Sequence, residues 1–128
     1  MSYKKTILIV DDDPTILSIL AASLEREYDV LLASDGVNAA YLYERNMEKV
    51  AAIVTDLEMP RLTGQSLAEW VHHICPQLPV IIMSGNFRTI SLSDLPRRPM
   101  TSFLGKPFDP SELEVVLQRV LDIHGQAV

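Results

Sequence analysis

The chain has 128 residues, of which 48% are hydrophobic and 22% charged, and this globular composition and length predict one domain over residues 1–128 with a core of about 5–124. Its 11 Lys and Arg against 17 Asp and Glu leave a net charge of −6, which argues against direct nucleic-acid binding and against a polybasic membrane-surface protein. A single cysteine excludes an internal disulfide framework, and no apolar run approaches the ~18 residues of a membrane span. We therefore expect a cytoplasmic protein.

Short apolar runs alternate along the chain with amphipathic segments. Runs that are apolar at successive positions predict buried strands, and apolar residues at spacings of three and four predict helices. In chain order, the expected elements are strand Thr6–Val10, helix Pro14–Tyr28, strand Asp29–Ala33, helix Gly36–Asn46, strand Val50–Thr55, helix Gly64–Ile74, strand Val80–Met83, strand Ser102–Leu104 and helix Pro110–His124. Asp13 and Asp109 each precede a proline at the first helical position and are predicted to be N-caps.

This alternation predicts an α/β fold, a doubly wound parallel sheet with helices on both faces. One segment departs from the pattern. A fourth crossover helix is expected between the last two strands, but Asn86–Met100 contains Pro96 and Pro99. Because proline interrupts a helix, we expect an atypical or shortened fourth helix there.

Polar residues follow the predicted strands at the point where each strand ends. Asp11 and Asp12 follow the first strand, Asp56 ends the third, Ser84 ends the fourth and Lys106 follows the fifth. In open α/β sheets, ligand sites lie outside the carboxyl ends of the strands. Four strands are therefore expected to bring these residues to one place.

Three carboxylates in one place repel one another, by about 4 kcal/mol for two charges ~4 Å apart at an effective dielectric near 20. A Mg²⁺ ion suits one or two such carboxylates together with waters and a phosphate oxygen. Lys106 adds a second cation and Ser84 a hydroxyl donor. This set of groups is suited to phosphoryl transfer, and the nucleophile could be a carboxylate.

These residues also carry a resemblance that covers essentially the whole chain. Four segments contribute to it, in this order: Ile7-Leu8-Ile9-Val10-Asp11-Asp12-Asp13-Pro14, then Val54-Thr55-Asp56-Leu57-Glu58-Met59-Pro60 followed by Gly64, then Pro79-Val80-Ile81-Ile82-Met83-Ser84-Gly85, and Phe103-Leu104-Gly105-Lys106-Pro107-Phe108. Each is weak to moderate alone, but together and in order they are very specific. The chain resembles the receiver domain of two-component response regulators.

The resemblance implies a flavodoxin-like (βα)5 fold with five parallel strands in the order 2-1-3-4-5. It also implies a Mg²⁺ site, for which Mn²⁺ is a possible substitute. Asp12, Asp56 and the backbone carbonyl of Glu58 would be direct ligands, and Asp11 would act through a metal-bound water.

The same resemblance implies a signalling switch rather than an enzyme with an external substrate. Asp56 would be the phosphoacceptor, and a sensor histidine kinase or a histidine phosphotransfer protein would be the donor. Lys106 would pair with Asp56 and then with the phosphoryl group. Ser84 would hydrogen-bond a phosphoryl oxygen, and Phe103 would be the aromatic switch residue. The Lys106-Pro107 bond is typically cis in this family, and the output partner is unknown.

Two alternatives remain open at this point. Asp11-x-Asp13-x-Thr15 matches the D-x-D-x-T signature of haloacid-dehalogenase-like phosphatases. Against this alternative, the chain is short for that fold, has no adjacent acidic pair beyond Lys106 and would leave Asp56 without a role. The other alternative is a receiver-like interaction module that is not phosphorylated.

Overall fold

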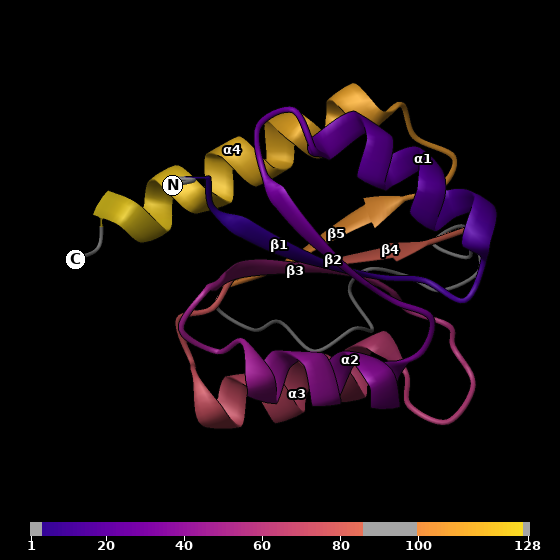
Figure 1. Ribbon diagram of the computed structural model, residues 1–128, viewed down its shortest axis with the longest axis vertical. Helices are drawn as coiled ribbons and strands as arrows, with labels where there is room; N and C mark the ends of the chain where they lie inside the picture. The colour runs from indigo at the N-terminus through magenta and orange to yellow at the C-terminus, as the bar shows by residue number, and fades with distance from the viewer. Residues whose placement is uncertain (1–3, 86–99, 127–128) are drawn as a thin grey trace.

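A computed structural model describes residues 4–85 and 100–126 of the chain (Figure 1). The elements are β1 (Thr6–Val10), α1 (Pro14–Leu24), β2 (Asp29–Ala33), α2 (Gly36–Arg45), β3 (Val50–Asp56), α3 (Gly64–Ile74), β4 (Val80–Ser84), β5 (Thr101–Gly105) and α4 (Pro110–Gln126). The five strands are parallel and lie in the order β2-β1-β3-β4-β5, so the predicted flavodoxin-like sheet is confirmed. The predicted atypical fourth helix falls almost wholly in 86–99, outside the described residues.

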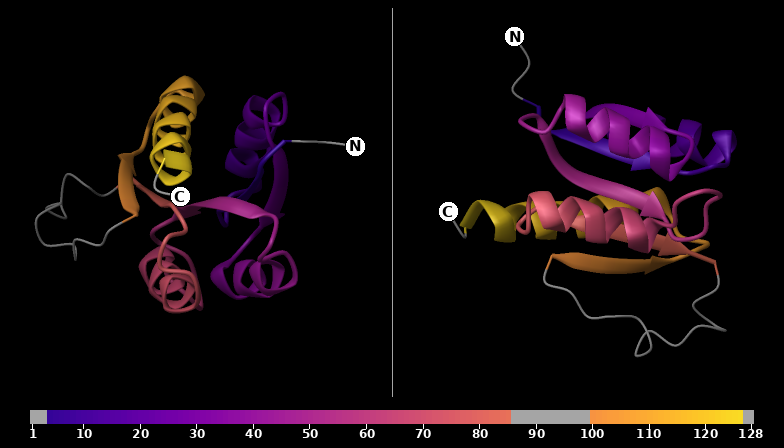
Figure 2. Two further views of the ribbon diagram at one scale, coloured as in Figure 1. Left: turned by 90° about the vertical axis from the view of Figure 1, so that its left-hand side faces the viewer. Right: turned by 90° about the horizontal axis from the view of Figure 1, so that it is seen from below.

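Helices cover both faces of the sheet. Figures 1 and 2 show α1 and α4 on one face and α2 and α3 on the other. Because both faces are covered, β1 and β4 are buried over almost their whole length, as their continuous apolar sequences predict. The core therefore consists of two apolar clusters, one on each side of the sheet.

The N-caps predicted for the first and last helices are present. The backbone N–H of Thr15 donates to Asp13 Oδ1, and that of Ser111 donates to Asp109 Oδ1, each at 2.9 Å. Each bond satisfies a donor that the first turn of a helix leaves free.

The largest error in a predicted helix boundary is at α1, which ends at Leu24 rather than at Tyr28, whereas α2 and α4 end within two residues of their predicted bounds. The three residues between them, 25–27, are charged and exposed and form a turn. Beyond this turn the ring of Tyr28 is buried in the cluster beneath α1 and α4. Because the Tyr28 ring is buried just before β2, the helix ends earlier than its apolar pattern indicates.

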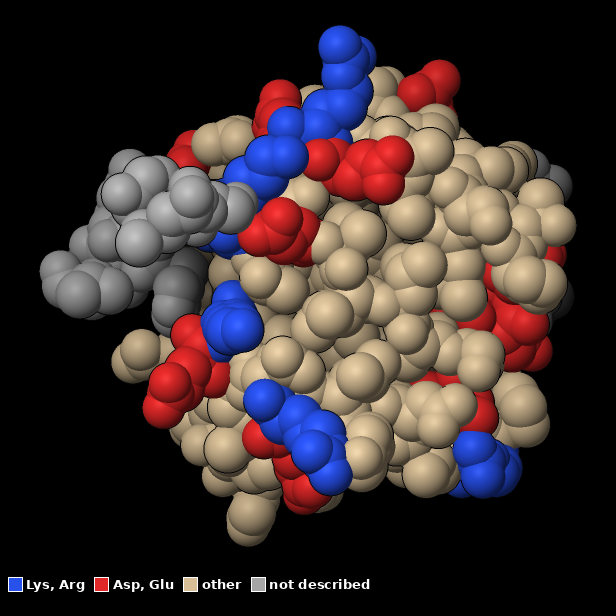
Figure 3. All heavy atoms as spheres, viewed as in Figure 1, with Lys and Arg blue, Asp and Glu red and all other residues tan. Residues whose placement is uncertain are grey.

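The face that carries α1, β2 and α2 has few charges at its centre. Figure 3 shows uncharged side chains there, with acidic and basic groups around the border. Among the described residues, no helix combines the length and apolar character needed to cross a membrane.

Candidate functional site

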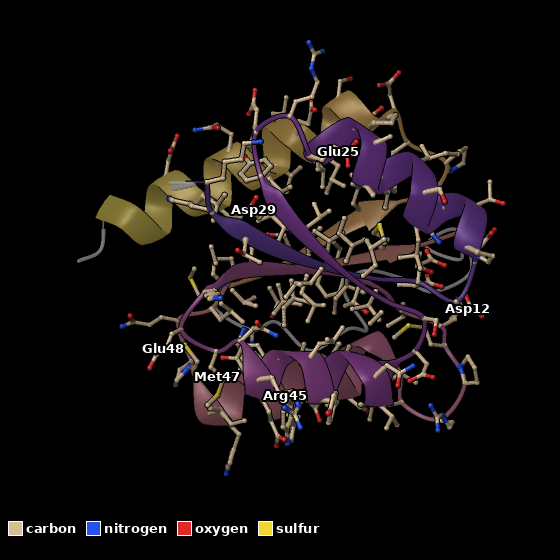
Figure 4. The ribbon with its side chains drawn as sticks, in the orientation of Figure 1. Asp12, Glu25, Asp29, Arg45, Met47 and Glu48 are labelled. Carbon is tan, nitrogen blue, oxygen red and sulfur yellow. The ribbon has the colours of Figure 1, made fainter. Side chains whose placement is uncertain are left out.

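The carboxyl ends of four neighbouring strands meet at one edge of the sheet. Register explains this, because Val10 of β1 pairs with Thr55 of β3, and Asp56 pairs with Met83 of β4. Ser84 in turn pairs with Gly105 of β5. The polar residues at the strand ends are therefore brought together as predicted, and Figure 4 labels Asp12 at this edge, where β1 leads into α1.

Three carboxylates form the centre of the site. Oxygens of Asp11, Asp12 and Asp56 all lie within 4.8 Å of one another. Asp11 is 1% exposed and Asp56 8%, whereas Asp12 is open to solvent. The site therefore combines two buried carboxylates with one that a ligand from solvent can reach.

Lys106 supplies a cation to this cluster. Its Nζ lies 3.4 Å from Asp56 Oδ1, which is the expected pair, but it lies closer to Asp11 Oδ2, at 2.9 Å. Burial alone would lower the pKa of Lys106, but the hydrogen bond to Asp11 and the charges of Asp56 and Asp11 outweigh burial and raise that pKa. Lys106 is therefore a fixed positive charge between two carboxylates.

Asp56 lies in an environment that disfavours its ionised form. Burial raises the pKa of its carboxyl; Lys106 opposes this shift, while the negative charges of Asp11 and Asp12 add to it. The backbone of Asp56 is held in place by the Thr55 hydroxyl, which donates to the Asp56 carbonyl at 3.0 Å. The backbone of Asp56 is thus held, while the charge of its carboxylate is only partly balanced.

Ser84 ends β4 and is 1% exposed. Its hydroxyl donates to Glu58 Oε1 at 3.3 Å. A hydrogen bond between these two side chains was not predicted from the sequence. No sequence pattern marks it, because it joins the end of β4 to the loop after β3.

The loop after Asp56 is tied to the start of α2 by a further ion pair that sequence reasoning missed. Arg61 donates to Asp35, whose side chain also accepts from the backbone N–H of Asn38 and caps α2. The position of Asp35 before a helix indicates the cap, but nothing in the sequence indicates Arg61 as its partner.

The last two sequence-predicted features lie on and after β5. Phe103 is partly buried and packs against the core cluster on the α2 and α3 side. The Lys106-Pro107 peptide bond is cis, as expected. Beside the site, a side chain at Gly85 would meet no described atom within 4 Å.

The donor set of this site fits a divalent cation. Three carboxylates against the single ammonium of Lys106 leave an excess of negative charge among the described residues of the cluster. Carboxylate and carbonyl oxygens are the hard ligands that Mg²⁺ prefers. The residues present therefore match the predicted Mg²⁺ site in chemistry.

Comparisons with known proteins agree with this geometry. The chain is 32% identical over 124 residues to the transcriptional regulatory protein GlrR of Escherichia coli K12, covering 95% of this chain and 28% of that protein. It is 34% identical over 116 residues to a two-component response regulator of Oryza sativa subsp. indica, covering 90% of this chain and 17% of that protein. The chain thus spans less than a third of the length of these relatives.

Solved structures show the same fold. The receiver domain of the sensor histidine kinase PA1611 from Pseudomonas aeruginosa, solved with a magnesium ion in its active-site cleft, is 29% identical. It superposes with a TM-score of 0.82 over 93% of this chain and 98% of that chain. A receiver domain protein from Clostridium thermocellum, 23% identical, has the same fold with a TM-score of 0.84 over 97% of this chain and 99% of that chain.

Residues 7–118 match the profile of the response regulator receiver domain. The match includes all of the strand residues except Thr6, together with the acidic cluster, Ser84 and Lys106. The chain therefore belongs to the response regulator receiver domain family.

Proposed function

We propose that this receiver domain is a phosphorylation switch whose Asp56 accepts a phosphoryl group from a phosphohistidine donor. The observation that carries the proposal is the position of Asp56 at the end of β3, clustered with Asp11 and Asp12 and 3.4 Å from Lys106. Receiver domains are signalling switches that partner with histidine kinases. We expect the donor to be a sensor histidine kinase or a histidine phosphotransfer protein, and the site of action to be the cytoplasm.

In the proposed transfer, an Asp56 carboxylate oxygen attacks the phosphorus of the phosphohistidine. A P–O bond forms, the P–N bond breaks, and the imidazole nitrogen keeps the bonding electron pair. Apart from the attack by Asp56, the protein takes little part in the covalent chemistry, so its contribution is to position the reacting groups and to stabilise the charge on the phosphoryl group. Lys106, already close to Asp56, is placed to pair with the transferred group.

Asp12, Asp56 and the backbone carbonyl of Glu58 would hold Mg²⁺, and Asp11 would act through a metal-bound water. When bound, the ion neutralises charge on the transferred group. Mn²⁺, which takes similar oxygen ligands, is a possible substitute. Lys106 occupies Asp11 Oδ2, and the backbone N–H of Asp13 donates to Asp11 Oδ1 at 2.9 Å, which supports an indirect role for Asp11.

The proposed output of the switch is a change at Ser84 and Phe103. Once Asp56 is phosphorylated, the Ser84 hydroxyl is expected to hydrogen-bond a phosphoryl oxygen. Phe103 lies on the neighbouring strand β5, in register with Ile82 of β4, and would move inward as Ser84 moves. A partner or an output domain would bind differently to the changed surface.

Labelling with a small phosphodonor such as acetyl phosphate tests the proposal. In the presence of Mg²⁺ we expect an acid-stable, base-labile adduct that forms on the wild-type chain and is lost in Asp56→Asn. Chelation of the metal should abolish it as well. Circular dichroism checks that the variant is folded.

Two results would contradict the proposal. A label that requires Asp11 and survives Asp56→Asn would indicate the haloacid-dehalogenase-like phosphatase instead. A folded chain that no donor labels, including a panel of phosphorylated histidine kinases, would indicate an interaction module that is not phosphorylated.

A further inference from the structure

A hydrogen bond links two side chains that flank Asp56. Ser84, at the end of β4, donates its hydroxyl to Glu58 Oε1 at 3.3 Å. Glu58 follows Asp56 by two residues, and its side chain is exposed, whereas Ser84 is buried. The contact therefore joins a buried donor to a carboxylate that can turn away into solvent.

The backbone of Ser84 is held on both sides, so its hydroxyl can change partner only by rotation of the side chain. The Ser84 carbonyl accepts from the backbone N–H of Lys106 at 2.8 Å. On the other side, the carbonyl of the preceding Met83 accepts from the N–H of Leu57 at 2.8 Å. Rotation about the Cα–Cβ bond of Ser84 thus decides to which acceptor its hydroxyl donates.

Glu58 is fixed in its backbone in the same way. Leu57 and Met59 on either side are buried, at 7% and 8% exposure. The carbonyl of Leu57 also accepts from the N–H of Gly64 at 2.9 Å, which closes the loop. A change of the Ser84–Glu58 contact therefore involves the Glu58 side chain rather than the backbone of this loop.

A serine hydroxyl carries one proton and can donate it to one acceptor at a time. While that proton is donated to Glu58, it is not available to a phosphoryl oxygen on Asp56. We propose that Glu58 is a positioning residue that acts through Ser84: its carboxylate holds the Ser84 hydroxyl in the unphosphorylated arrangement and competes with the phosphoryl group for it. This inference rests on the proposed function of Asp56.

The arrival of the phosphoryl group would weaken the hold of Glu58. The group adds about −1.5 to −2 of charge at neutral pH, and like charges repel. The exposed Glu58 side chain can then turn to solvent while Ser84 donates to the phosphoryl oxygen. Glu58 would thus favour the resting arrangement without blocking the switch.

Binding of beryllofluoride, an analogue of the phosphoryl group, tests the inference. We would measure its dissociation constant by isothermal titration calorimetry at saturating Mg²⁺ for the wild type, Glu58→Ala, Ser84→Ala and the double variant. Glu58→Ala should bind about three- to tenfold more tightly than the wild type, the range that one hydrogen bond contributes. In the Ser84→Ala background the same substitution should change affinity less than twofold.

Fluorine NMR of the bound analogue adds a readout of the Ser84 bond itself. The fluorine that accepts from Ser84 should shift in Ser84→Ala and keep the wild-type position in Glu58→Ala. Glu48→Ala removes the same charge from the opposite end of the sheet (Figure 4) and should leave affinity unchanged.

An unchanged or weaker affinity of Glu58→Ala for beryllofluoride overturns the inference. An equal gain in affinity with and without the Ser84 hydroxyl also overturns it, because that gain would be an effect of charge alone. Failure of the proposed function gives a different result: the wild type and Asp56→Asn would then both fail to bind the analogue.

Discussion

Asp56 is held by contacts that leave no room for a side chain at Gly64. A Cβ atom built on Gly64 would fall on the backbone carbonyl oxygen of Asp56, closer than real Cβ atoms approach their neighbours. The start of α3 therefore packs directly on the backbone of the proposed phosphoacceptor. The sequence predicted Gly64 only as part of a motif, and the structure supplies the steric reason.

Gly64→Ala should consequently destabilise the fold and displace Asp56. We expect a loss of about 1–3 kcal/mol in the free energy of unfolding, as overpacking in a core typically causes, and slower labelling of Asp56. Urea denaturation measures the first effect. Gly85→Ala is the matched control, because its Cβ meets no described atom within 4 Å. Equal denaturation midpoints for the two variants would refute the steric argument.

At the scale of elements, the start of α2 and the loop after β3 support each other. Asp35 caps α2 and pairs with Arg61 of that loop. The backbone hydrogen bond from Asn38 and the contact with Arg61 lower the pKa of the Asp35 carboxyl. Gly36 lies against Leu62 of the same loop, so packing adds to the charge contact. The loop that carries Glu58 is thereby anchored to a neighbouring helix.

The lowered pKa of Asp35 predicts a dependence of stability on pH. A carboxyl whose folded pKa is depressed stabilises the fold above its unfolded pKa, near 4, and this contribution is lost as pH falls through the folded pKa. Asp35→Asn keeps a capping side chain but not the charge, so it should be less stable than the wild type at pH 7. The difference should shrink as the pH is lowered below 4. Urea midpoints across this range measure it, and a difference independent of pH would exclude the charge contribution.

At the scale of the whole molecule, folding concentrates part of the net charge of −6 at one edge of the sheet. Asp11 and Asp12 follow β1 and Asp56 ends β3, so the repulsion between the first two carboxylates and Asp56 arises only when the strands pair. Lys106 offsets part of it. The folded chain thus contains an unfavourable cluster of negative charge, and a bound divalent cation would reduce the repulsion within it.

Mg²⁺ should therefore stabilise the folded chain, by about 1.4 kcal/mol at ten times its dissociation constant. Asp12→Asn should raise stability in the presence of chelator, by up to about 1 kcal/mol, because it removes one like charge from the cluster. It should also abolish most of the gain from Mg²⁺. Thermal denaturation with and without Mg²⁺ measures both effects, with Glu48→Gln at the opposite end of the sheet as control. A gain from Mg²⁺ that persists in Asp12→Asn would place the ion elsewhere.

Most of the elements and the residues of the site could be predicted from the amino-acid sequence. The strands Thr6–Val10 and Asp29–Ala33 and the helix Gly64–Ile74 were predicted with the bounds that the structure has. Apolar periodicity and helix capping depend on residues that are close in sequence, so the positions of strands and helices can be predicted from the sequence. The gathering of acidic residues, Ser84 and Lys106 at one edge also followed, because parallel strands share their carboxyl ends.

The contacts between these groups, in contrast, depend on the folded chain. The tertiary structure placed Lys106 nearer to Asp11 than to Asp56, turned Ser84 toward Glu58 and paired Arg61 with Asp35. It also ended α1 at Leu24, where burial of a later ring competes with helix formation. The three side-chain contacts join residues that are far apart in the chain and depend on strand register and on loop conformation. Small differences in distance decide between possible partners, and local sequence does not encode them.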